Sequence, residues 1–273
     1  MFAARRKSGF IRLSKVKDSL QTEILGHPFL YFRELNSTSD MAKELAIRGA
    51  GEGTVIIAET QTKGRGRLKR EWLSPAGGLW LSIILRPRTE PKHASKLTLM
   101  VSVAVAKTII KLFRLKTEIK WPNDVLIEGK KVCGILTEAK TEGKTLDFVV
   151  VGIGINANFR VNALPSSLQD SSTTIRENLK KDVEGEGLLC TLLEEIESYY
   201  YLFTNGKFCT ILNEWRGLAS FLGSYVEVTS HGEKIEGKAI DIDENGALMV
   251  KLKDQSICRV ISGDLTLLRI RDS

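Results

Sequence analysis

The stretch that decides the fold is LDFVVVGIGI, Leu146–Ile155, in which six of the first eight residues are apolar. A short apolar run rich in β-branched residues predicts a strand buried at the centre of a sheet. Gly152 and Gly154 form a G-x-G pattern, but G-x-G-x-x-G and a strand-to-helix turn are lacking, which argues against a Rossmann dinucleotide site. We interpret the two glycines as positions that leave room for a ligand or a neighbouring strand to lie close to the backbone. Asn156, at the strand end, is either a hydrogen-bonding partner for a base or ribose, or a turn cap.

Further strands and helices are predicted on both sides of this run. Short apolar segments predict strands at Tyr31-Phe32, Thr54–Ala58 and Leu79–Leu85, and a hairpin of Val125–Ile127 and Lys131–Glu138. Helical spacing and capping residues predict one helix after Asn36–Asp40 and others at Ala94–Phe113, Gly187–Phe203 and Phe208–Leu218.

The chain changes character beyond Phe221. Five short β-rich segments alternate with turns, at Tyr225–Thr229, Lys234–Asp241, Ala247–Leu252, Ser256–Ile261 and Leu265–Leu268. Asn245-Gly246 and Ser262-Gly263 have turn chemistry. This pattern predicts a small β-barrel, with a domain boundary near Ala219.

The composition is that of a globular protein with an excess of positive charge. Charged residues make up 27%, the formal net charge is +7 and the pI is about 9.2. Such a protein is suited to binding nucleic acid, an anionic surface or an anionic substrate such as ATP. Six cations precede the first acidic residue, Asp18; they are Arg5, Arg6, Lys7, Arg12, Lys15 and Lys17. They form either a basic arm or a solvated terminus.

No secretory signal or membrane-spanning run is found in the sequence. The four cysteines, Cys133, Cys190, Cys209 and Cys258, are widely spread and form no C-x-x-C pair. This pattern predicts a reduced, cytoplasmic protein without a disulfide framework or structural zinc. The three histidines have no metal-binding spacing, so no protein metal site is predicted.

The chemically most informative stretch is ETQTKGRGRLKREW, Glu59–Trp72. Five cations follow a predicted buried strand, and Gly64 and Gly66 let the backbone approach a ligand closely. Guanidinium groups bind carboxylate and phosphate in bidentate fashion, so the segment is interpreted as an anion-binding loop. The alternative is a solvated basic loop that contacts RNA. The segment is not a P-loop, because G-K-[ST] is absent.

Two other stretches carry candidate site residues. In KWPND, Lys120–Asp124, the proline restricts the backbone, and that rigidity is expected to hold Lys120 and Asn123 toward a pocket. Lys131 opens the second strand of the predicted hairpin, where it either reaches an anionic ligand or is an exposed strand-end lysine.

Taken together and in this order, these stretches resemble the biotin–protein ligase family from about Phe32 to the C-terminus. The matching elements are GRGR at Gly64–Arg67, KWPND at Lys120–Asp124, KVCGILTE at Lys131–Glu138 and VGIGIN at Val151–Asn156. The resemblance implies an α+β fold: a mixed β-sheet flanked by helices, like the class II synthetase-like catalytic domain of biotin and lipoate ligases, followed by an SH3-like barrel. The expected division is a basic segment at 1–28, a catalytic domain at 29–218 and the SH3-like domain at 219–273.

The resemblance also implies a two-step reaction. Biotin and ATP give biotinyl-5′-AMP and pyrophosphate, and a lysine of a biotin carboxyl carrier protein then takes the biotinyl group and releases AMP. Both steps build negative charge near phosphate, so positioned cations are the main requirement, with Mg²⁺ expected to accompany ATP.

The roles that the resemblance implies follow the matching positions. Lys131 and Arg67 are the expected catalytic cations. The expected biotin contacts are Ser37, Thr38, Ser39, Gln61, Gly64, Arg65, Gly66, Arg67, Lys131 and Gly134. The expected nucleotide contacts are Arg67, Trp72, Lys120, Asn123, Lys131 and Asn156.

The chain departs from the family pattern at two places. Leu68–Glu71 stands where many relatives have another arginine and a glycine, which puts the dynamics of the loop in doubt. About 30 residues precede the match, too few for the winged helix of the relatives that repress transcription. We therefore expect a monofunctional enzyme that binds no specific DNA and no membrane. A homodimer is also expected, because members of the family often dimerise through the sheet.

Two other functions compete with this interpretation. A lipoate or octanoate ligase or transferase shares the scaffold, and its transferase branch usually relies on a nucleophilic cysteine, for which Cys133 is the nearest choice. Its neighbours Val132 and Gly134 suggest that Cys133 is a buried packing residue instead. A basic nucleic-acid-binding module is the second alternative, but it would lack the several aromatic residues of a single-strand platform.

Overall fold

The structure is a computed structural model that describes residues 10–143, 145–230 and 232–268. Arg5, Arg6 and Lys7 of the predicted basic segment lie outside the described residues.

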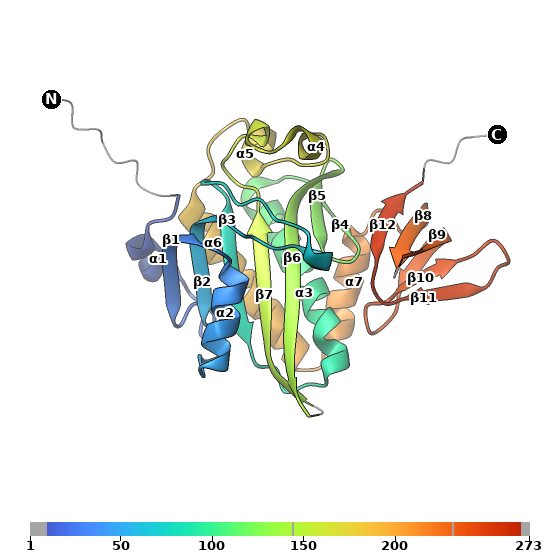
Figure 1. The fold of residues 1–273 in the computed structure, drawn as a ribbon, viewed down its shortest axis with the longest axis horizontal. Helices are drawn as coiled ribbons and strands as arrows, with labels where there is room; N and C mark the ends of the chain where they lie inside the picture. Colours follow the sequence, from blue (N-terminus) through green and yellow to red (C-terminus); the bar gives the residue numbers. More distant parts are fainter. Residues whose placement is uncertain (1–9, 144, 231, 269–273) are drawn as a thin grey trace.

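Two β-sheets organise the described part of the chain (Figure 1). The strands of the large sheet are β1 (Phe29–Leu35), β2 (Val55–Gln61), β3 (Leu79–Leu85), β4 (Thr117–Lys120), β5 (Asp124–Ile127), β6 (Lys130–Glu142) and β7 (Thr145–Ile155). The helices are α1 (Leu13–Ser19), α2 (Thr38–Ile47), α3 (Ala94–Phe113), α4 (Ser166–Gln169), α5 (Ile175–Leu179), α6 (Gly185–Thr204) and α7 (Phe208–Leu218). Single 3₁₀ turns are η1 (Arg67–Lys69), η2 (Pro91–His93) and η3 (Val161–Ala163).

The large sheet is mixed, in the order β1-β2-β3-β7-β6-β5-β4. Only β1 and β2 pair in parallel; the other neighbours are antiparallel. β7 lies between β3 and β6, and all of its residues from Phe148 to Ile155 are buried. The prediction of a central buried strand is therefore confirmed, since a strand with neighbours on both sides and both faces covered has no polar face to present.

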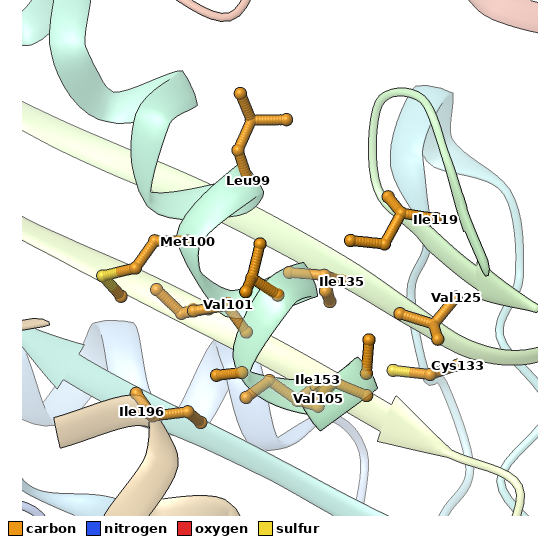
Figure 2. Packing of buried hydrophobic residues seen from close by; sticks show 14 of the residues in the cluster. Leu99, Met100, Val101, Val105, Ile119, Val125, Cys133, Ile135, Ile153 and Ile196 are labelled. Carbon is orange, nitrogen blue, oxygen red and sulfur yellow. The ribbon is translucent and has the colours of Figure 1, made fainter. Parts of the chain in front are cut away.

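The two faces of the sheet have separate apolar cores. α3 packs on one face together with α6 and α7, and Figure 2 shows Val101 and Val105 of α3 close to Ile135 and Ile153 of the sheet. α2 alone covers part of the opposite face, in front of the sheet in Figure 1, through a smaller cluster of buried residues. The sheet flanked by helices is as predicted, and α2 leaves part of this face to other segments, among them the one that carries Trp72.

The C-terminal strands form the small second sheet, which we call the C-terminal barrel. They are β8 (Tyr225–Ser230), β9 (Glu233–Ile242), β10 (Leu248–Lys251), β11 (Ile257–Val260) and β12 (Asp264–Leu267), in the order β11-β10-β9-β8-β12. All pairs are antiparallel. The buried Trp121 Nε1 donates a hydrogen bond to Gly246 O at 3.1 Å, so the barrel is fixed against the edge of the large sheet. The small β-rich domain was predicted correctly, while the exact boundary at 218/219 stays a prediction.

Several elements were not predicted. β4 has only four residues, and α1 has one buried residue, so neither carries a hydrophobic period long enough to detect. The sequence suggested a loop from Thr60 to Pro75, but β2 continues to Gln61, two residues into that range. Among the described residues, no helix is long and apolar enough to span a bilayer.

Candidate active site

A cavity of about 420 Å³ opens on the α2 face of the sheet. It lies between the first turn of α2, the segment after β2, and strands β6 and β7. It is lined by almost all of the predicted site residues: Ser37, Thr38, Ser39, Gln61, Arg65, Gly66, Arg67, Trp72, Lys120, Asn123, Lys131, Gly134 and Asn156. Segments separated by more than 100 residues therefore meet in one place. Gly64 is not part of the lining; a Cβ there would lie 2.3 Å from Trp72 O, so the backbone packs too closely for a side chain.

A β-bulge brings two of these residues to the same face of β6. Val125 of β5 pairs with Cys133 but Leu126 pairs with Lys131, which leaves Val132 as an extra residue. In a regular strand, residues three apart point to opposite faces. The bulge changes this alternation, and Lys131 and Gly134 both line the cavity. Lys131 is held further by its backbone N–H, which donates to Ser171 O at 2.8 Å.

Two glycines form a flat floor beneath the indole of Trp72. Gly134 of β6 and Gly154 of β7 are register partners. A Cβ on Gly134 would lie 2.8 Å from Trp72 Cζ3, and one on Gly154 would lie 2.5 Å from Trp72 Nε1. Lys131 Nζ lies 5.1 Å from the ring centroid, a cation–π distance. The glycines thus let a large aromatic ring lie on the sheet at the cavity.

A buried network of hydroxyl and amide groups lines the end of the cavity near α2. Ser37 is the N-cap of α2, and Thr38 donates to Gln61 Oε1 through both its N–H (2.8 Å) and its hydroxyl (3.1 Å). Ser82 Oγ lies 2.8 Å from Thr38 Oγ1 and 3.1 Å from Ser39 Oγ. Ser82 was missed, although a lone serine in the apolar run Leu79–Leu85 is a signal that sequence reasoning can use. The network offers donors and acceptors of mixed kind in a fixed arrangement.

The segment after β2 supplies arginines to the rim of the cavity. Arg65 Nη2 lies 2.5 Å from Asp40 Oδ1 and 3.2 Å from Glu138 Oε2. Arg67 Nη1 donates to Asn123 Oδ1 at 3.1 Å. Burial lowers the pKa of Arg67 from its usual value, while the nearby acidic residues oppose that shift. Both arginines therefore meet carboxylate or amide oxygens at the rim of the cavity.

The other predicted nucleotide contacts lie at the β5–β7 side of the cavity. Asn123 Nδ2 donates to Ile135 O at 2.8 Å, which fixes the amide against β6. Asn156 is buried, and its Nδ2 donates to Thr173 O at 3.1 Å, so its donor side holds the loop that follows. Asp124 was not predicted as a site residue, but its Oδ1 lies 2.7 Å from Lys131 Nζ. The position of Asp124 in the KWPND motif, next to Asn123, could have identified it from the sequence as a site residue.

Cys133 lies on the other face of the sheet. It is fully buried, and Figure 2 shows it among the apolar residues beneath α3, beside Val125. Burial raises the pKa of its thiol well above the usual range, which keeps the nucleophilic thiolate scarce. It does not line the cavity. The interpretation of Cys133 as a packing residue agrees with this position, and a cysteine-dependent transferase is disfavoured.

Comparison with known proteins gives one consistent family. Residues 31–156 match the Biotin/lipoate A/B protein ligase family, and residues 221–267 match the Biotin protein ligase C terminal domain. The Bifunctional ligase/repressor BirA of Bacillus subtilis is 36% identical over 96% of this chain and 81% of its own length. The Biotin–[acetyl-CoA-carboxylase] ligase of Mycobacterium tuberculosis is 30% identical over 86% of either chain. A solved biotin protein ligase from Aquifex aeolicus, in complex with biotin and ATP, has a TM-score of 0.76 at 31% identity and covers 88% of this chain and 98% of its own.

The mixed sheet, its cation-lined cavity and the barrel that follows define the class of biotin and lipoate ligases. Within that class, the chain belongs to the biotin protein ligase family.

Proposed function

We propose that this protein activates biotin with ATP and transfers it to a lysine of a biotin carboxyl carrier protein. In the first step a carboxylate oxygen of biotin attacks the α-phosphorus of ATP, and pyrophosphate leaves. In the second step the lysine amine attacks the acyl carbon of biotinyl-5′-AMP, and AMP leaves. The observation that carries the proposal is the meeting of Arg65, Arg67 and Lys131 with the buried network of hydroxyl and amide groups at a single cavity. The Aquifex aeolicus relative, in complex with biotin and ATP, supports the substrates.

The network near α2 suits the ureido ring of biotin. That ring has two N–H donors and a carbonyl acceptor, and it needs partners of both kinds. Ser37, Thr38, Ser39 and Gln61 supply them, with Arg65 and Gly66 closing the same end. Gly134, which lines the same cavity as Lys131, is the proposed contact of the valeryl tail.

The proposed catalytic cations act where the two substrates meet. Lys131 reaches the biotin carboxylate and the α-phosphate, and its charge stabilises the negative charge that develops there. Its ion pair with Asp124 holds the ammonium group over the floor of the cavity. Arg67 acts from the rim of the cavity beside Asn123, and a guanidinium group suits phosphate oxygens by its planar, forked geometry. Trp72, Lys120, Asn123 and Asn156 complete the proposed nucleotide side.

Mg²⁺ is proposed as the activator that arrives with ATP. Among the described residues, no group of three or more His, Cys, Asp or Glu side chains is placed to hold a metal ion. Nucleotide-bound Mg²⁺ usually takes one or two protein carboxylates and keeps the phosphates and waters as its other ligands. Asp124, beside Asn123 in the cavity wall, fits that need and would supply one oxygen. The metal would screen the phosphate charge.

We further propose a cytoplasmic homodimer. The four cysteines are free, as expected for a reducing compartment. In the described sheet β1 and β4 are the edge strands, and an edge strand offers backbone groups to a second copy. Light scattering after size-exclusion chromatography tests the dimer. The expected lack of specific DNA binding stays a prediction, and a gel shift with salt titration tests it.

The proposal is tested by replacing Lys131 and, as a matched control, its neighbour Lys130. Lys130 is exposed and does not line the cavity. We expect Lys131→Ala to lower the initial rate of biotin-dependent pyrophosphate–ATP exchange by about 100-fold or more, the size of effect seen for a group that stabilises developing charge. Lys130→Ala should keep the rate, and both variants should unfold at the temperature of the unchanged protein. Full exchange activity in Lys131→Ala would contradict the proposed role.

A further inference from the structure

The C-terminal barrel contacts the arginine-rich segment of the catalytic site. Arg67 Nη1 and Nη2 each donate to Gly263 O at 3.2 Å, and Arg67 Nη1 lies 3.9 Å from Asp264 Oδ1. Arg70 forms an ion pair with the same carboxylate. Nearly 200 residues separate the partners in sequence, and Asp264 itself lines the cavity. One acidic residue of the barrel thus meets two arginines of the site.

The two sides of this contact differ in how firmly the fold holds them. Asp264 is the first residue of β12 and pairs with Thr229 of β8. Gly263, just before it, packs so closely that a Cβ would lie 2.8 Å from Thr229 O. The arginines, in contrast, belong to a segment with a single 3₁₀ turn, in which Leu68 and Lys69 have φ of 53° and 60°. Left-handed backbone in non-glycine residues is sparsely populated and needs support from its surroundings.

We propose that Asp264 is a positioning residue that holds Arg67 and Arg70 over the cavity, so that retention of the adenylate depends on the barrel. This inference rests on the proposed function. The rigid carboxylate keeps the guanidinium groups at the rim, where they close the site on biotinyl-5′-AMP until the acceptor lysine arrives. When the carboxylate is neutralised, the arginine-rich segment opens more often and the intermediate escapes. Asp264 is not expected to touch the reacting atoms.

The test measures how fast the enzyme releases biotinyl-5′-AMP when no acceptor protein is present. We expect Asp264→Asn to raise that release rate on the order of fivefold to tenfold, as fits the loss of charge-assisted contacts that are partly exposed. Asp264→Glu should restore most of the retention. Glu236→Gln, a charge loss at an exposed site on β9 of the same barrel, should leave the rate unchanged. The thermal unfolding temperature should be the same in all variants, which separates positioning from damage to the fold.

Arg70→Ala is the second arm of the test, because it lies outside the barrel and perturbs no packed core. It should raise release to a similar extent, and Asp264→Asn in the Arg70→Ala background should add less than it does alone. Release at the unchanged rate in both single variants, or fully multiplicative effects in the double variant, would overturn the positioning role. If the unchanged protein forms no adenylate from biotin and ATP, the proposed function itself fails, and this result is distinct from the others.

Discussion

Replacing Gly154 by alanine adds a single methyl group beneath the indole of Trp72. In the structure that carbon would lie 2.5 Å from Trp72 Nε1, 2.7 Å from Cε2 and 3.0 Å from Cζ2. Ordinary carbon contacts lie at about 3.5–4.0 Å, so the ring must move by roughly 1 Å. Gly134 packs equally closely on the same ring, which leaves the indole only the direction into the cavity. Overpacking of this kind costs about 1–3 kcal/mol. Because the free protein relieves it by moving the ring into the cavity, a ligand must push the ring back against the methyl group, and a cost of that size corresponds to roughly a 5- to 150-fold loss of ligand affinity.

Tryptophan fluorescence provides the assay. Trp80, Trp121 and Trp215 are fully buried, whereas Trp72 is partly exposed and lines the cavity, so ligand-dependent changes should come from Trp72. Trp72→Phe should abolish the signal. Titration with biotin and ATP should show the weakened affinity in Gly154→Ala, while Gly217→Ala, where an added Cβ meets nothing within 4 Å, should bind normally. Wild-type affinity in Gly154→Ala would refute the packing argument.

The remaining predictions concern the core, a buried carboxylate and acid stability. Cys133→Ser should keep most of the exchange activity because the thiol lies under α3, and a thousandfold loss in a folded variant would contradict its assignment as a packing residue. Glu197→Gln should lower the free energy of unfolding by about 1.5–3 kcal/mol in urea, since the carboxylate accepts three backbone N–H groups at residues 23–25; no change would contradict this. Burial tends to raise the pKa of Asp243, but hydrogen bonds from the Ala247 and Asn245 N–H groups and from Arg259 hold that pKa below its usual value. The stability they provide is present above about pH 4 and is lost as the pH falls through the native pKa, so Asp243→Asn should show a shallower loss of stability in acid.

Elements with strong local patterns were predictable from the sequence. The bounds of Leu79–Leu85, Ala94–Phe113 and Phe208–Leu218 agree with the structure residue for residue, because a long apolar period or a continuous apolar run leaves few alternatives. β4 has alternation over only four residues, TEIK, and gives no comparable signal. The resemblance to a family, in contrast, supplied the mixed sheet as a whole, which no local pattern specifies.

The candidate site was predictable as a set of motifs but not as a geometry. The sequence indicated that Lys131 and Gly134 matter, but strict alternation puts them on opposite faces of a strand. The extra residue Val132 resolves this, and a β-bulge depends on the pairing with β5 rather than on the residue types. Asp264 gave no signal at all, because its partner Arg67 lies 197 positions earlier in the chain and only the packed barrel brings them together. Contacts of this length follow from tertiary structure alone.

The reaction proposed for the cavity is the activation of biotin as its adenylate. The most direct measurement is pyrophosphate–ATP exchange by the purified protein with Mg²⁺, offered biotin, lipoate or octanoate in separate reactions. We expect exchange with biotin and none above background with the other two acids, because lipoate and octanoate carry no ureido ring to hydrogen-bond with the hydroxyl and amide groups near α2. Exchange with lipoate or octanoate but not biotin would contradict it and assign the chain to the lipoate branch, and no exchange with any acid would contradict adenylate formation altogether.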